Sequence, residues 1–128
     1  MKGSLGGEIM SFLSIIFVLI VSLEHFYILA LEMFFLSSQA AKRSFGLSDE
    51  AVASKQIQTL FANQGLYNGF LAAGLLYGLI REDQGIVIFF LSCVIIAALY
   101  GSITSNRSIL IKQGLPAIIA LLLVLLVS

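Results

Sequence analysis

Two carboxyl groups and a histidine lie close together inside an apolar segment of this chain. Glu24, His25 and Glu32 interrupt a run that is otherwise largely hydrophobic from Ile9 to Leu36. At 3.6 residues per turn, Glu32 lies about 80° around a helix from Glu24, and His25 lies about 100° from Glu24, so the three side chains share one side. Ionisable groups within a membrane segment are costly and usually functional. We therefore expect this side to face other helices of the protein.

The chemistry open to these three groups is the exchange of protons and the holding of positive charge. Glu24, His25 and Glu32 would titrate as a coupled set, which suits proton relay, general acid catalysis or cation binding. The alternative is structural, with the glutamates tying helices together and His25 paired with an acid or a backbone carbonyl. One histidine and one distant cysteine do not provide a transition-metal ligand set, so no metal site and no cofactor are predicted.

The composition indicates a membrane protein of one domain, residues 1–128. The chain is 59% hydrophobic and 11% charged, whereas soluble domains have roughly a quarter of their residues charged. Seven basic and seven acidic residues cancel, so no nucleic-acid partner is expected. Cys93 cannot form an internal disulfide and is expected to be a small buried hydrophobe.

The elements that must position these groups are four membrane-spanning helices joined by mostly short loops. The predicted fold is an all-α integral membrane bundle of four transmembrane helices. Its spans are residues 9–36, 56–80, 85–104 and 109–127. The one longer loop should contain a short interfacial helix, because Ser48 is a good cap and Asp49 and Glu50 suit a first turn. Pro116 should kink the fourth span unless it lies in the first turn.

The second span has two unlike faces, both expected to be buried in protein. One carries polar groups from Asn63, Gln64 and Tyr67, with Asn68 just beyond. The opposite face is a ladder of small residues that would let another helix approach closely. The ladder consists of Ala62, Gly65, Gly69 and Ala73.

Depth along the helices predicts a polar cavity that opens toward the cytoplasm. Depth follows from a rise of about 1.5 Å per residue. Glu32 shares one level with Asn63, Gln64, Tyr100 and Gln113. A deeper level contains Glu24, His25, Tyr67 and Asn68. The predicted binding residues are Glu24, His25, Glu32, Asn63, Gln64, Tyr67, Asn68, Tyr100 and Gln113. Glu24, His25 and Glu32 are also the candidates for catalysis.

Basic residues set the expected orientation. Lys42, Arg43, Lys55, Arg107 and Lys112 lie beside the first and third loops, and Lys2 and Arg81 lie on the opposite side. Because basic loops stay in the cytoplasm, both termini are predicted to lie outside it. The expected location is the bacterial inner membrane, crossed several times.

Three motifs resemble a known bacterial family. They are the stretch from Leu23 to Phe34, the core Asn63-Gln64-Gly65-Leu66-Tyr67-Asn68-Gly69-Phe70, and Gln113-Gly114-Leu115-Pro116-Ala117. Together they resemble the membrane family catalogued as domain of unknown function 1304. The resemblance implies a small four-helix inner-membrane protein and brings no established activity.

Three functions remain open from the sequence. The first is binding or transport of a small molecule, a cation or a proton in the acid-lined cavity. A homo-oligomer would help a carrier that has no broken helix or inverted repeat. The second is an intramembrane enzyme that uses acid/base chemistry on a lipid-like or isoprenoid substrate. The third is a structural or regulatory membrane subunit. The expected partners are the lipid bilayer and a small-molecule or lipid-like ligand.

Overall fold

The regular elements in the described part of the chain are all helices. The structure is a computed structural model that describes residues 10–127. Its elements are α1 (Phe12–Met33), α2 (Gln39–Phe45), α3 (Asp49–Ala53), α4 (Lys55–Ile80), α5 (Gln84–Thr104), the π-helix η1 (Leu110–Gly114) and α6 (Leu115–Leu126). The all-α prediction is therefore confirmed. The described residues include neither Ile9, where the first span was predicted to begin, nor Lys2, which was used to predict the orientation. The location of the termini outside the cytoplasm therefore stays a prediction.

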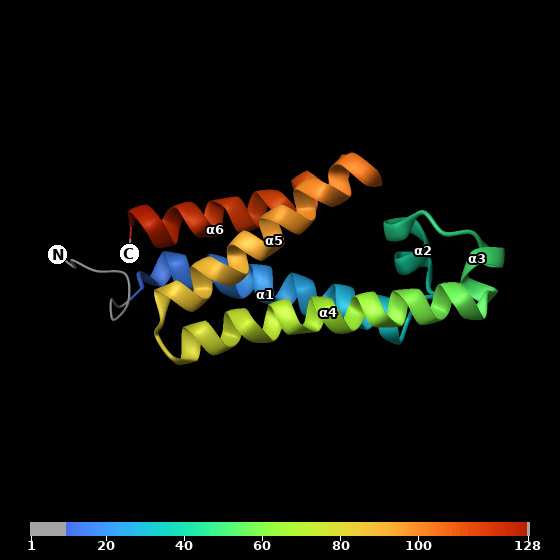
Figure 1. The fold of residues 1–128 in the computed structure, drawn as a ribbon, viewed down its shortest axis with the longest axis horizontal. Helices are drawn as coiled ribbons and strands as arrows, with labels where there is room; N and C mark the ends of the chain where they lie inside the picture. The colour runs from blue at the N-terminus through green and yellow to red at the C-terminus, as the bar shows by residue number, and fades with distance from the viewer. Residues whose placement is uncertain (1–9, 128) are drawn as a thin grey trace. The chain divides into compact units, whose positions relative to one another are not determined.

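Two compact units make up the chain, and each is described by itself. The first contains Met1–Glu24 and Leu71–Ser128, of which residues 10–24 and 71–127 are described. Within it, α5 and α6 lie side by side (Figure 1). Its core consists of Met10, Val18, Val21, Leu75, Val87, Leu91, Val94, Ala117, Ala120 and Val124. The Ser22 hydroxyl donates a hydrogen bond to the carbonyl of Ala72 at 3.0 Å, so a polar contact also joins α1 to α4 in this unit.

The second unit, His25–Phe70, contains the end of α1, the two short helices and the start of α4. The amide of Ala51 donates to the Ser48 hydroxyl at 3.0 Å, which confirms the predicted cap of α3. Helix α2 was not predicted from the sequence. Its start is capped by Ser38, and it ends at Gly46, whose φ of 66° is the left-handed conformation that glycine adopts most easily.

Pro116 is the second residue of α6, but α6 continues directly from η1, so Pro116 lies inside the helical segment and not in the first turn of the fourth span. The preceding turn is widened, because the N–H of Leu115 bonds to the carbonyl of Leu110, five residues earlier. In an ordinary α-turn the proline ring would clash with the carbonyl of Lys112. The helix is thus distorted directly before the proline, where such a clash would arise.

Among the described residues, α1 and α5 are long and apolar enough to cross a membrane. The segment Leu110–Leu126 is apolar but shorter. Although α4 is 26 residues long, it does not meet the same test, and Asn63, Gln64 and Asn68 reduce its apolar character. Four membrane spans therefore stay a prediction. The first helix ends at Met33 rather than at the expected Leu36.

Candidate functional site

Glu32, near the C-terminal end of α1, is the most buried of the predicted acids. Its side chain is 5% exposed, and its Oε1 accepts a hydrogen bond from Nδ2 of Asn68 at 2.8 Å. The same amide nitrogen also donates to the carbonyl of Gln64, one turn earlier on α4, at 3.2 Å. Both residues belong to the second unit. The structure thus joins two of the predicted site residues that are 36 positions apart.

Glycines on α4 allow this contact. A Cβ added at Gly65 would lie 2.6 Å from Cγ of Met33 and 3.1 Å from Cβ of Glu32, so only a glycine fits here without a shift. One turn later, a Cβ at Gly69 would meet a methyl of Leu29 at 2.5 Å. This confirms the packing role predicted for the two glycines. Asn68 lies three residues after Gly65, and at this short separation it can reach Glu32.

A pocket of about 320 Å³ lies at the end of α1. Its lining residues are Glu32, Met33, Phe34, Phe35, Leu36, Ser37, Ser38 and Gln58. Glu32 is the only ionisable side chain among them, so any formal charge that the lining carries is negative. The second carboxyl oxygen of Glu32 accepts no hydrogen bond from any described residue, and it is the oxygen available to a ligand.

The backbone at this helix end adds unpaired polar groups. The N–H groups of Phe34 and Phe35 both bond to the carbonyl of Ala30, each at 3.0 Å. As a result, the carbonyls of Glu32 and Met33 accept no hydrogen bond within residues 10–127. Free carbonyls carry the negative end of the helix dipole. The end of α1 therefore adds partial negative charge beside the Glu32 carboxyl group.

Two other polar residues of the lining are partly used within the protein. The Ser38 hydroxyl donates to the carbonyl of Phe35 at 2.7 Å and accepts from the amide of Ala41 at 3.1 Å. Nε2 of Gln58 donates to the carbonyl of Val52 at 2.8 Å. These bonds fix the turn that follows α1 and connect α3 to the start of α4, so they position the walls of the pocket.

Glu24 and His25 are described in different units. Glu24 is half-buried, and its Oε1 has no hydrogen-bond partner among the described residues. His25 is 1% exposed. Their assignment to one site with Glu32 stays a prediction.

The polar face of α4 is not buried as expected. Asn63 and Gln64 are exposed, and Tyr67 is 62% exposed. The reason is that α4 turns Gly65 and Asn68, rather than these three residues, toward the end of α1. Their assignment as binding residues stays a prediction.

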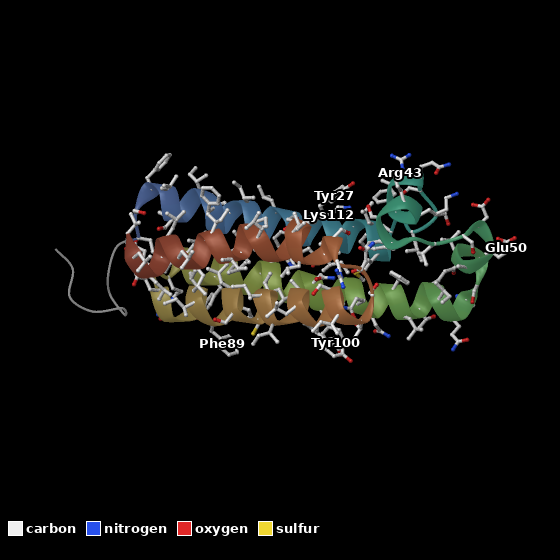
Figure 2. The ribbon with its side chains drawn as sticks, turned by 90° about the horizontal axis from the view of Figure 1, so that it is seen from above. Tyr27, Arg43, Glu50, Phe89, Tyr100 and Lys112 are labelled. Carbon is white, nitrogen blue, oxygen red and sulfur yellow. The ribbon has the colours of Figure 1, made fainter. Side chains whose placement is uncertain are left out.

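The remaining predicted site residues belong to the first unit. Tyr100 is 70% exposed and projects away from α5, as does Phe89 (Figure 2). Gln113 lies half-buried in η1. Cys93, expected to be buried, is half-buried. Nothing in the structure tests a binding role for Tyr100 or Gln113.

A second hollow lies on the outer side of the two short helices. It includes an ion pair of 2.7 Å between Lys42 and Asp49, which links α2 to α3. Lys42 holds the pKa of the Asp49 carboxyl below its usual value, through a hydrogen bond and through charge attraction. Arg43 and Glu50 project outward from the same helices (Figure 2). Since Lys42 is already paired, we assign this hollow a structural role.

One protein family matches almost the whole described part of the chain. The model of a family described as "Protein of unknown function (DUF1304)" matches residues 19–125. A protein of Lactococcus lactis subsp. lactis (strain IL1403), named "Uncharacterized protein YpaA", is 44% identical over 115 residues, which are 88% of this chain and 97% of its own. No solved structure matches. The matched range contains every predicted site residue.

Proposed function

This chain belongs to the family described as "Protein of unknown function (DUF1304)", and we propose that it is a small bacterial membrane protein that binds a cation through Glu32. The proposed architecture has four membrane helices, formed by α1, α4, α5 and the segment Leu110–Leu126. The length and apolar character of α1 and α5 support it. The amides of α4 are the main cost of this architecture, and contacts such as that of Asn68 with Glu32 reduce the cost.

One observation carries the proposal: the carboxyl group of Glu32 is buried, but only one of its oxygens has a hydrogen-bond partner. A buried carboxyl group held by one amide and bordering a pocket is suited to pair with a positive charge. The free carbonyls of Glu32 and Met33 favour the same sign of charge. The site lies at the end of a long apolar helix, so a ligand would reach it from the membrane surface.

Binding can be tested on the purified protein in micelles of an uncharged maltoside detergent. Thermal unfolding would be followed with sodium, potassium, ammonium and small organic amine salts at constant ionic strength. A cation that binds only the folded protein raises its stability by about 2.7 kcal/mol at a hundredfold excess over Kd. We expect at least one cation to stabilise the parent protein and to leave Glu32→Gln unchanged.

The matched control is Glu50→Gln, which removes a carboxyl group from the exposed surface of α3. This variant should respond to the cation as the parent does. Glutamine at position 32 keeps an oxygen that can accept from Asn68, so folding of Glu32→Gln should be preserved. If every cation stabilises Glu32→Gln as much as the parent, the proposal is wrong.

A further inference from the structure

We propose that the ligand of the Glu32 pocket is a small organic ammonium ion that also carries an oxygen, such as choline or ethanolamine. This inference rests on the proposed function, because it needs Glu32 to bind a cation. The same chemistry occurs in free amines and in the headgroups of zwitterionic lipids. The experiment below separates these two sources.

The size and charge of the pocket favour an organic cation over a bare metal ion. Calcium takes six to eight oxygen ligands, and magnesium is bound in an ordered octahedral shell. The lining provides one carboxyl group, and the described residues form no group of three or more His, Cys, Asp or Glu side chains that could hold a metal. A volume of about 320 Å³ is far larger than a single ion and falls within the range of small-molecule sites.

Aromatic and other apolar residues form part of a wall whose accessible surface is otherwise mostly polar. Phe34 and Phe35 both line it, and Phe35 is 59% exposed. The faces of aromatic rings attract cations, and quaternary ammonium groups are recognised in this way. Met33 and Leu36 add apolar surface that would contact the carbon atoms around the nitrogen. A strongly hydrated inorganic cation gains little from the aromatic and apolar part of the wall.

Unpaired donors in the same turn would hold the oxygen of the ligand. The N–H groups of Leu36 and Ser37 make no hydrogen bond within the described residues, and both residues line the pocket. The Ser37 side chain is exposed. A ligand that carries an ammonium group at one end and a hydroxyl group at the other would therefore meet a partner at each end.

The decisive comparison is between choline and 3,3-dimethylbutan-1-ol, which has the same shape with carbon in place of the charged nitrogen. Binding would be measured by titration calorimetry on the full chain in maltoside micelles, which contain no ammonium headgroup. We expect choline to bind and the neutral analogue not to bind. Glu32→Gln should weaken choline binding about tenfold to a hundredfold, because it removes a charge-assisted contact. Glu50→Gln should bind as the parent does.

A second variant keeps the test independent of any change at Glu32. Phe35→Leu retains an apolar wall but removes the ring, and it should weaken choline binding about two- to fivefold. Because Phe35 is largely exposed, this variant should fold normally.

Each outcome decides the matter. Binding of choline or ethanolamine supports the inference with a free amine as the source. Binding only of phosphatidylethanolamine added to the micelles, again dependent on Glu32, supports it with a lipid headgroup as the source. Binding of sodium or potassium alone, dependent on Glu32, overturns this inference and leaves the proposed function standing. No binding that depends on Glu32 overturns both, and equal binding of choline and its neutral analogue overturns the inference.

Discussion

Replacing Gly65 with alanine should destabilise the protein although alanine is the better helix former. The added Cβ would lie 2.6 Å from Cγ of Met33, 3.1 Å from Cβ of Glu32 and 3.3 Å from the carbonyl oxygen of Leu29. The last two atoms belong to, or lie next to, the backbone of α1. They cannot be moved by rotating a flexible side chain, so the two helices must separate.

The magnitude follows from two opposing effects. Overpacking of this kind costs about 1 to 3 kcal/mol. Alanine in a helix interior gains about 1 kcal/mol over glycine. The net loss in the free energy of unfolding should therefore reach about 2 kcal/mol at most. Because Glu32 is one of the displaced residues, cation binding should weaken in the same variant.

Equilibrium unfolding of the purified protein in micelles, followed by circular dichroism, measures the stability change. Gly101→Ala is the matched control, since the nearest atom to its added Cβ is a methyl group of Ile109 at 3.4 Å, an ordinary contact. It should be neutral or slightly stabilising. If Gly65→Ala were as stable as the parent and bound cations equally well, the close approach of α4 to the end of α1 would be refuted.

Two further predictions concern features away from the pocket. Lys42→Met should raise the pKa of the Asp49 carboxyl toward its ordinary value, because Lys42 is what lowers it. The pKa of Asp49 is lower in the folded protein than in the unfolded chain. The ion pair therefore stabilises the protein fully at a pH above the pKa of the unfolded chain, and this stabilisation is lost as the pH falls through the pKa of the folded protein. NMR titration measures the change, and Lys55→Met should leave the Asp49 pKa where it is in the parent. Pro116→Ala should change the free energy of unfolding by less than about 1 kcal/mol, because η1 already removes the clash that costs about 3 kcal/mol in a regular helix. Chemical denaturation measures this free energy, and a Pro116→Ala variant about 3 kcal/mol more stable than the parent protein would contradict the prediction.

The local features of the fold were the most predictable from the sequence. Ser48 followed by Asp49 and Glu50 indicates a helix start, because a cap depends only on the next three residues, and α3 begins at Asp49. The same kind of signal, Ser38 before α2 and Gly46 after it, was present but not used. The π-turn could not be predicted, since it depends on how the chain resolves the clash at Pro116 rather than on any residue type.

The contacts of the site depend on which face of α4 meets α1. Glu32 as a site residue and Gly65 as a packing residue were both predictable from the sequence. Depth along the helices placed Glu32 level with Asn63 and Gln64, whereas the structure pairs Glu32 with Asn68. Periodicity groups residues by face, but it does not determine the rotation of one helix against another to within one residue. The turn after Met33 was also missed, because it is built by backbone bonds to Ala30 that have no signature in the sequence.

The π-turn of η1 has a consequence for chain length. It holds one more residue than a regular turn would need, so the side chains after Gly114 point about 100° away from where an unbroken α-helix would place them. Deleting one residue within Leu110–Gly114 and replacing Pro116 with alanine, so that no ring clashes in the regular turn, would allow a continuous helix and keep Ala117, Ala120 and Val124 on the same buried side. Family members that are one residue shorter at this point and lack the proline would therefore preserve the core of the first unit.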